Sequence, residues 1–314
     1  MYNFFLRPQG FRDFSTRRTS YCYLLLNLSF LSVRKRAGGT CEKNQLVSAI
    51  SVASRTVAQK SAISGLEGIL IRAGVKVMLT GYNLETGITV SVDADIQETG
   101  ACVMPARLFF DIVRKLPDDT VSIQVDESFK VSIKGGISSF TITALSADDY
   151  PELPDVDSEK GIRVPQNELK AMISGTIFAV SENQARPIHT GVLFEVDNDS
   201  ITSVAVDGYR LALRRYLPEE SLERTLKFVA PAAALKEVEK ILGDTDDPAT
   251  FYPGSKHILF TIGDATLVCR ILEGEFLDWR RVLPQNNPVK LVGNVSRLTD
   301  SIERVGLVIS EKLK

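Results

Sequence analysis

The chain has 314 residues, of which 44% are hydrophobic and 24% charged, enough apolar material for two domain cores. Residues 1–40 carry seven Lys or Arg residues and one acid, so residues 41–314 hold 30 basic and 38 acidic side chains. An acidic body of this kind argues against a protein that grips nucleic acid through bulk positive charge.

The first segment in chain order, residues 1–40, differs from the rest. Arg17 and Arg18 precede an apolar run from Tyr21 to Val33, which is shorter than the ~20 residues that span a bilayer. Twin arginines before an apolar stretch resemble an export signal, but polar residues interrupt the run and no small-x-small cleavage site follows it. We expect a foreign extension outside the fold, from an upstream start or a joined reading frame, with an export signal as the alternative.

Helical segments then recur at domain-sized intervals. They occupy residues 44–57 and 166–181, and a third begins at Val295. The leading leucine of the second lies 123 residues after that of the first, and the leading leucine of the third follows 129 residues later. Internal repetition of this length indicates a chain built from similar domains.

Each repeat has a second helix that a proline opens, at residues 105–116 and 231–242. Strand-like runs surround these helices, at residues 75–80, 88–92, 121–125, 130–133 and 140–143 in the first repeat and at residues 258–262 and 266–271 in the second. Two helices beside many short strands predict an α+β fold, in which the helices pack on antiparallel sheets.

Polar, turn-rich segments at residues 155–161 and 284–288 separate the repeats. We expect the first domain at residues 41–157, the second at 158–286 and the start of a third at 287–314. A lone helix cannot build a core, so we expect a truncated third domain and an incompletely folded C-terminal end.

Four phrases in this order resemble the bacterial sliding clamp family, the beta subunits of DNA polymerase III. They are Pro-Ala-Arg with Phe-Phe-Asp at 105–111, Arg-Pro at 186–187 leading to Gly-Val-Leu-Phe-Glu at 191–195, Val-Asp-Gly-Tyr-Arg-Leu-Ala at 206–212, and Arg-Arg-Val-Leu-Pro at 280–284. The resemblance covers residues 41–314. It implies a cytoplasmic, non-catalytic polymerase subunit without a cofactor, whose repeated domains form a homodimeric ring around double-stranded DNA when the chain is full length. Helices line the interior of such a ring.

The resemblance also implies which polar residues face DNA. They are Lys60 on the first helix, Arg107 and Arg114 on the second helix, and Asn183 and Arg186 in the matching loop of the second repeat. A ring that encircles DNA needs only weak phosphate contacts, which agrees with the acidic body. The alternative is an ordinary solvated charged face.

A second implied surface is an apolar pocket that binds short linear peptides of the polymerase, the clamp loader and repair proteins. Carried over to this sequence, the pocket comprises His189, Val206, Gly208, Tyr209, Arg210, Leu211, Leu277, Arg281 and Val282. Two residues depart from the family pattern, since His189 stands where leucine is usual and Leu277 where proline is usual. Ring closure in the family joins the first domain of one chain to the third domain of the other, so we expect no closed dimer from these 314 residues.

The sequence lacks the common catalytic and metal-binding patterns: it has no GxSxG, no glycine-rich phosphate loop and no HExxH. Its four cysteines are scattered without a CxxC pair, which is typical of reduced thiols in a cytosolic protein. The acidic segment 155–161 loosely resembles a calcium loop, but an interdomain linker is the simpler interpretation. The alternatives to a clamp are an enzyme of unknown type, a non-encircling adaptor and an exported peptide-binding module.

Overall fold

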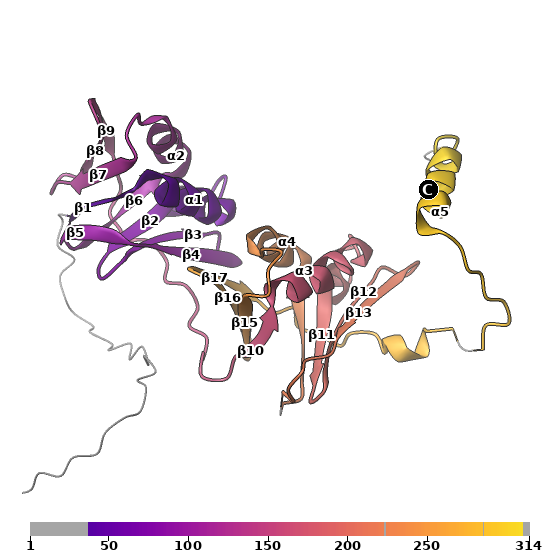
Figure 1. Ribbon diagram of the computed structural model, residues 1–314. Coiled ribbons are helices and arrows are strands. Elements are labelled where there is room, and N and C mark those ends of the chain that lie inside the picture. Colours follow the sequence, from indigo (N-terminus) through magenta and orange to yellow (C-terminus); the bar gives the residue numbers. More distant parts are fainter. Residues whose placement is uncertain (1–36, 223, 285, 310–314) are drawn as a thin grey trace, which may run out of the picture. The chain divides into compact units, whose positions relative to one another are not determined.

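The computed structural model describes residues 37–222, 224–284 and 286–309 (Figure 1). The expected extension therefore lies outside the described residues, apart from its last four. These four belong to the fold, because β1 (Ala37–Glu42) pairs with two neighbouring strands. The boundary at residue 40 was thus placed too late. The small residues of β1 give no hydrophobic alternation, but they allow close backbone approach: a Cβ on Gly39 would lie 2.7 Å from the Asp95 carbonyl oxygen.

The first repeat contains the two helices and the strands that the sequence predicted, together with further strands. Its elements are β1, α1 (Lys43–Ala53), β2 (Gly68–Ala73), β3 (Val77–Tyr82), β4 (Thr86–Val92), β5 (Ala94–Glu98), β6 (Gly100–Pro105), α2 (Ala106–Lys115), β7 (Thr120–Val125), β8 (Lys130–Gly135) and β9 (Ser138–Thr143). Two short 3-10 turns, η1 (Ser54–Thr56) and η2 (Ser64–Glu67), follow α1. α1 is shorter than predicted because the Ser54 hydroxyl donates to the Ile50 carbonyl at 2.6 Å and the Thr56 hydroxyl to Gly81 at 2.9 Å, which turns the chain away.

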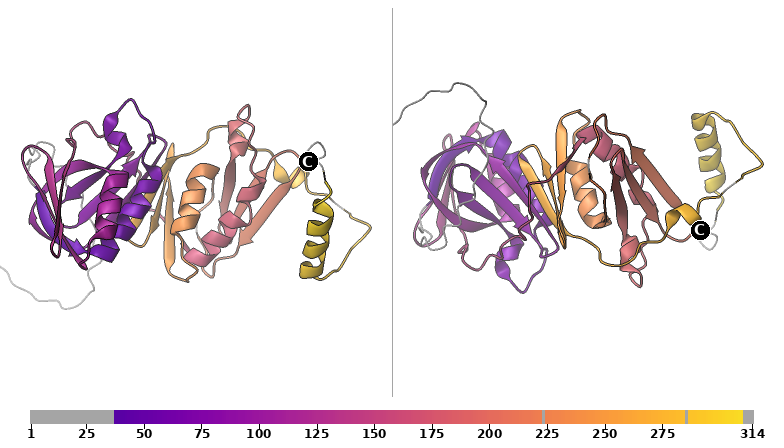
Figure 2. Two further views of the ribbon diagram at one scale, coloured as in Figure 1. Left: turned by 90° about the horizontal axis from the view of Figure 1, so that it is seen from above. Right: turned by 90° about the horizontal axis from the view of Figure 1, so that it is seen from below.

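The second repeat follows the same order, except that it has four strands between its two helices where the first repeat has five. Its elements are β10 (Ile162–Pro165), α3 (Gln166–Ser174), η3 (Ile177–Ala179), η4 (Pro187–Thr190), β11 (Gly191–Asp197), β12 (Ser200–Val206), β13 (Leu211–Tyr216), β14 (Leu226–Pro231), α4 (Ala232–Ile241), β15 (Pro248–Pro253), β16 (His257–Ile262), β17 (Ala265–Arg270) and η5 (Trp279–Arg281). α1 and α2 lie side by side in one repeat, as α3 and α4 do in the other (Figures 1 and 2). The α+β prediction is confirmed.

Three antiparallel sheets hold these elements together. Their strand orders are β5-β1-β7-β8-β9, β10-β15-β16-β17-β4-β3-β2-β6 and β13-β12-β11-β14. The eight-stranded sheet contains strands of both repeats, because β17 pairs with β4 and places Leu267 opposite Ile88. The linker predicted near residue 157 therefore lies between the two helix pairs, but strands from both sides of it belong to this one sheet.

Alternating side chains of the strands and one face of each helix form the core. α1 contributes Leu46 and Ile50 and α3 contributes Leu169 and Met172, all at most 1% exposed. Four phenylalanines of the second repeat pack in a row from β11 and β14 to β15 and β16 through ring contacts of 5.3 to 6.3 Å; they are Phe194, Phe228, Phe251 and Phe260. Among the helices that the structure describes, none combines the length and the apolar content that a membrane crossing needs.

α5 (Val295–Gly306) begins at the residue that the sequence predicted. The Asn294 side chain caps it by accepting a hydrogen bond from Arg297 N at 3.1 Å. Leu298, Ile302 and Val305 are each about 60% exposed, and none of the described residues of this helix is buried. The helix is therefore formed, although it contributes nothing to a core in the described structure.

Candidate functional site

A buried carboxylate organises the surface of the second repeat where most of the predicted peptide residues lie. Glu195 on β11 accepts hydrogen bonds from the Trp279 indole at 3.2 Å and from Arg280 at 2.8 Å, and pairs with Lys227 at 3.1 Å. Burial opposes ionisation of Glu195, but these bonds outweigh burial and hold its pKa below the ordinary value. The carboxylate thereby fixes η5 against β11 and β14.

An apolar cluster lies beside this carboxylate. Its buried members are Ile188, Leu193, Val204, Val206, Val229, Phe276 and Trp279, with Leu211 and Leu272 packed against them. Two predicted peptide residues belong to it, since Val206 and Leu211 lie directly opposite each other on β12 and β13. The cluster is a buried apolar surface that contains these two predicted residues.

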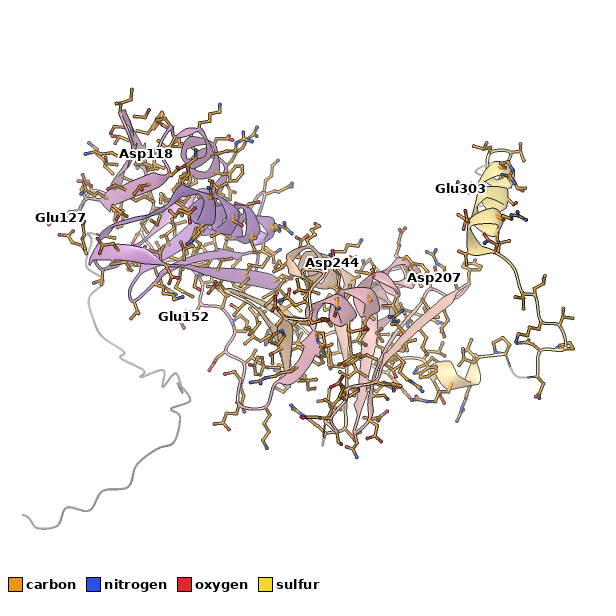
Figure 3. All side chains as sticks on the ribbon, in the orientation of Figure 1. Asp118, Glu127, Glu152, Asp207, Asp244 and Glu303 are labelled. Atoms are coloured by element: carbon orange, nitrogen blue, oxygen red, sulfur yellow. The ribbon has the colours of Figure 1, made fainter. Side chains whose placement is uncertain are left out.

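The loop between β12 and β13 is held by Asp207 (Figure 3). Its carboxylate accepts hydrogen bonds from Tyr209 N at 3.0 Å, Arg210 N at 3.1 Å and Arg210 Nε at 2.7 Å. These bonds, led by that from Tyr209 N, hold the pKa of Asp207 below its usual range despite some desolvation. Gly208 has a φ of +95°, which other residues rarely adopt. The loop presents Tyr209 fully exposed, and the Arg210 guanidinium lies 5.9 Å from the Phe178 ring.

His189 packs at the edge of the same cluster. Its ring meets that of Phe276 edge-on, with centroids 5.0 Å apart. Burial, with a smaller effect of Arg186, lowers the pKa of His189, and its Nδ1 is buried without a hydrogen-bond partner in the described structure. The neutral ring therefore takes the place of an apolar side chain.

Three further predicted residues lie on or beside η5. Leu277 and Val282 are 40% and 49% exposed, and Arg281 pairs with Asp278 at 2.9 Å. η5 is anchored by Trp279, which is 3% exposed. Leu277 and Val282 are thus exposed apolar side chains that flank a turn anchored in the cluster by Trp279.

Three of the predicted DNA-facing residues lie in corresponding loops of the two repeats. Lys60 is exposed in the loop after η1, not on the first helix as predicted, because α1 ends at Ala53. Asn183 and Arg186 are exposed in the loop after η3, where the Asn183 side chain accepts a hydrogen bond from Ala185 N at 2.9 Å. The two loops are therefore structural counterparts.

Arg107 and Arg114 lie on α2, and both side chains are exposed. Arg114 pairs with Asp111 at 3.6 Å, and its guanidinium lies 5.4 Å from the Phe110 ring centroid. An exposed pair of this kind contributes little to stability and leaves the guanidinium available to a phosphate. Arg107 and Arg114 therefore do not form a rigid, buried site.

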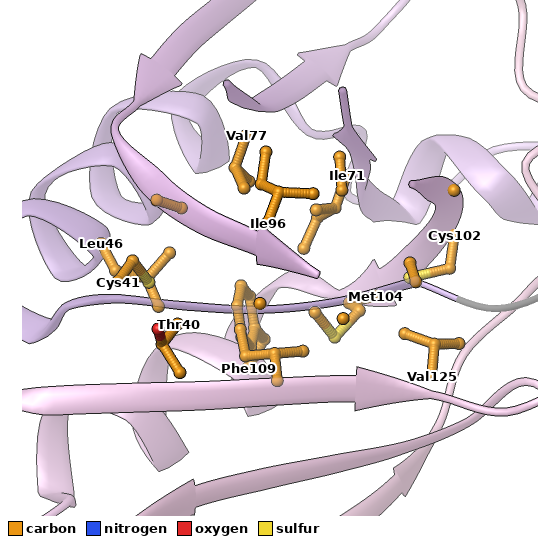
Figure 4. Close-up of a pocket in the computed structure, with 17 residues that line it drawn as sticks. Thr40, Cys41, Leu46, Ile71, Val77, Ile96, Cys102, Met104, Phe109 and Val125 are labelled. Atoms are coloured by element: carbon orange, nitrogen blue, oxygen red, sulfur yellow. The ribbon is translucent and has the colours of Figure 1, made fainter. Parts of the chain in front are cut away.

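A small apolar cavity in the first repeat carries no chemistry. It measures about 50 Å³, and Cys41, Leu46, Cys102, Met104 and Phe109 are among the residues around it (Figure 4). Burial raises the pKa of Cys41 to about 11 and that of Cys102 to about 12, so both thiols stay protonated at neutral pH. Within the described ranges no cluster of three metal-ligating side chains occurs.

Sequence reasoning missed the residues that hold η5 next to the predicted peptide residues. Glu195 lies in one phrase that the sequence singled out and Trp279 directly precedes another, but 84 residues separate them and no pattern indicates their hydrogen bond. A glutamate in an otherwise apolar strand was the available signal, because a buried charge needs partners.

Comparisons with known proteins agree with this architecture. Residues 39–154 match the family model of the DNA polymerase III beta subunit N-terminal domain, and residues 163–278 match that of its central domain. The beta sliding clamp of Staphylococcus epidermidis is 31% identical over 281 residues, covering 87% of this chain and 74% of that protein. The DNA polymerase sliding clamp structure of Bacillus subtilis is 30% identical with a TM-score of 0.84, and covers 88% of this chain and 75% of that one. A Eubacterium rectale beta subunit structure is 31% identical, with a TM-score of 0.82 and coverage of 88% and 76%.

Proposed function

The chain belongs to the family of DNA polymerase III beta subunits, the bacterial sliding clamps, and from this membership we propose that it acts as a DNA sliding clamp. In this role it tethers the replicative DNA polymerase and repair proteins to double-stranded DNA during replication. The observation that carries the proposal is the match of both repeats, in order, to the two domain models. We assign it a non-catalytic role in the cytoplasm, with a first domain that begins at Ala37 and extends to residue 157 and a second domain at residues 158–286.

DNA contact is assigned to Lys60, Arg107 and Arg114 in the first repeat and to Asn183 and Arg186 in the second. All five side chains are accessible to solvent, and Lys60 and Asn183 lie in counterpart loops. In this proposal the ring encloses DNA, so these residues steady the duplex and do not grip it. Two copies close the ring when the chain includes a third repeat.

The triple variant Lys60→Glu, Arg107→Glu and Arg114→Glu tests the DNA contacts. We expect weaker retention on nicked circular DNA. The slope of the logarithm of the binding constant against the logarithm of the salt concentration should also become less steep, by about 0.9 for each phosphate that the protein no longer neutralises. The matched control changes three basic residues outside the α1–α2 region, Lys130, Arg163 and Lys256, to Glu; all three are exposed. Equal weakening in both variants would show a general charge effect and contradict the assignment.

Retention also separates a clamp from a non-encircling adaptor. A protein that encircles DNA stays on a circle at high salt and is released when the circle is cut, whereas an adaptor binds both forms alike. This measurement uses a chain extended by a third clamp domain, compared with the 314-residue chain, and both are challenged at the same salt concentration.

We propose that the apolar cluster around Val206, together with Leu277 and Val282, binds short linear peptides of the polymerase, the clamp loader and repair proteins. Apolar anchors of the peptide would contact Leu277 and Val282, and Arg210 and Arg281 would meet its polar groups. Leu277→Asp is expected to weaken binding of a fluorescein-labelled polymerase peptide at least about tenfold, since a charge in an apolar contact costs more than ~1.4 kcal/mol. Val75→Asp, which changes a fully exposed residue of the first repeat, is the control and should bind normally.

A further inference from the structure

Glu237 on α4 lies between two cations. Its Oε1 accepts a hydrogen bond at 2.7 Å from Lys240 Nζ, about one turn further along the same helix. Its Oε2 lies 3.9 Å from Nη1 of Arg55, which belongs to η1 of the first repeat. One carboxylate therefore faces a cation of its own repeat and a cation of the other.

This carboxylate is only partly satisfied. Oε2 of Glu237 is buried and has no hydrogen-bond partner in the described structure, because 3.9 Å is too long for a hydrogen bond to Arg55. A buried oxygen without a donor lowers stability, and an ion pair with a lysine that is 57% exposed adds little. Stability therefore does not account for a glutamate at this position.

The ion pair between Glu237 and Arg55 lies beside both loops to which DNA contact is assigned. η1, which contains Arg55, directly precedes the loop that carries Lys60. α4 packs against η3, which precedes the loop that carries Asn183 and Arg186. Glu237 is therefore next to the surface that meets the duplex in the proposed function.

Both cations reach solvent. α4 turns Leu235 and Val238 into the core, and Glu237 and Lys240 lie on one side of the helix because three positions separate them. The side chain of Lys240 is 57% exposed and that of Arg55 is 29% exposed. A phosphate beside α4 can therefore compete with the carboxylate for each cation.

The carboxylate opposes such a phosphate in two ways. It occupies the donors of Lys240 and neutralises part of the charge of both cations. It also repels the phosphate directly, since two negative charges that share one cation lie close together. Lys240 and Arg55 are therefore weaker phosphate ligands with Glu237 present than without it.

We propose that Glu237 keeps Arg55 and Lys240 from binding DNA phosphates and thereby weakens the hold of the chain on the duplex. This inference rests on the proposed function as a sliding clamp. Each phosphate contact that a protein forgoes lowers its affinity for DNA and the salt dependence of that affinity. Glu237 is thus a positioning residue that acts through two cations and sets how loosely DNA is held.

A purely structural role of Glu237 leads to a different expectation. If the carboxylate only joined the two repeats, its replacement would change DNA binding no more than the loss of any other negative charge nearby. Glu239 on the same helix measures that general effect, because its carboxylate has no ion pair or hydrogen bond to the described residues. Glu239→Gln is therefore the matched control for Glu237→Gln.

The test measures binding of the 314-residue chain to a short fluorescein-labelled DNA duplex by fluorescence anisotropy, over a series of KCl concentrations. Binding to a linear duplex needs no closed ring. The variants are Glu237→Gln, Glu239→Gln, and Glu237→Gln combined with Arg55→Gln, with Lys240→Gln or with both. Circular dichroism and thermal melting establish that each variant is folded.

We expect Glu237→Gln to bind the duplex roughly tenfold more tightly at about 50 mM KCl for each phosphate that it gains. The slope of the logarithm of the binding constant against the logarithm of the salt concentration should steepen by about 0.9 for each phosphate, and by about 1.8 if both cations are released. Arg55→Gln or Lys240→Gln in the Glu237→Gln chain should each reverse about 0.9 of this change, and Glu239→Gln should leave the slope as in wild type.

Equal affinity and equal slope of Glu237→Gln and Glu239→Gln would overturn the inference. A gain that persists when Arg55 and Lys240 are both replaced would also overturn it. The triple glutamate variant of the proposed DNA contacts, measured in the same assay, separates this failure from that of the proposed function. If the triple variant binds as tightly as wild type, the assigned DNA surface is wrong and the inference fails with it. If the triple variant binds more weakly while Glu237→Gln matches Glu239→Gln, only the inference fails.

Discussion

Replacing the buried carboxylate of Glu195 tests how η5 and the proposed peptide surface are held in place. The carboxylate is 10% exposed, and Glu195→Ala leaves the buried Trp279 N–H without an acceptor. A buried donor without a partner costs about 1–3 kcal/mol. The side chains of Arg280 and Lys227 are 54% and 51% exposed, so water can solvate their charges when the carboxylate is removed. The loss of each ion pair therefore lowers the free energy of unfolding by at most about 1 kcal/mol. We expect Glu195→Ala to lower the free energy of unfolding by about 2–4 kcal/mol.

Glu195→Gln separates the two contributions. The amide oxygen can still accept from the Trp279 indole, so only the two charge pairs are removed, and stability should fall by about 1–2 kcal/mol. Urea unfolding followed by the fluorescence of Trp279, the single tryptophan, measures both variants. Glu168→Gln, which removes an exposed 3.6 Å pair with Arg214, is the control and should change stability by less than about 1 kcal/mol.

The pH dependence of the Glu195→Gln difference provides a second measurement. The pKa of Glu195 is lowered on folding, so its stabilising effect is complete above the ordinary value of 4.5 and is lost as pH falls through the lower folded value. The stability gap between wild type and Glu195→Gln should therefore close below pH 4.5. A gap that persists there, or an alanine variant as stable as wild type, would refute the anchoring role of this carboxylate.

Three further predictions concern the interior. Cys41→Val should partly fill the cavity of about 50 Å³ and raise the free energy of unfolding, measured in urea, by up to about 1 kcal/mol. Cys269→Val lies away from that cavity and should lower the free energy of unfolding by overpacking. Burial raises the pKa of Cys41 to about 11 and that of Cys102 and Cys269 to about 12. Iodoacetamide at mildly alkaline pH should therefore modify these three thiols only after unfolding. Peptide mass maps that show labelling of the native chain would contradict this prediction. The His189 ring should titrate below its ordinary pKa of 6.5 by NMR, and Arg186→Ala should raise that midpoint; an unchanged midpoint would remove Arg186 as a cause.

Local patterns in the sequence predicted the repeated helices well. The 123-residue spacing of the leading leucines carries Lys60 onto position 183, and the structure places both residues in the loop after a 3-10 turn. Proline before each second helix also gave the correct start of α2 and α4. These features depend on neighbouring residues, which the sequence displays directly.

Features that depend on distant partners could not be predicted. β1 has an alanine and two glycines at its start, so only its pairing with β7 identifies it as a strand. The junction of β4 and β17 joins residues about 180 positions apart, and hydrophobic alternation says nothing about which strand lies next to which. The hydrogen bond between Trp279 and Glu195 also joins residues far apart in the chain, so the sequence could not predict it.

The sheet that runs through both repeats has a consequence for how the chain unfolds. If the first repeat melts, β17 loses β4 and exposes a strand edge with Leu267 and Cys269, side chains that are otherwise 1% exposed. An uncovered apolar edge of this kind recruits other chains into aggregates. Calorimetry should therefore record a single transition for the two repeats, and heating through this transition should be irreversible.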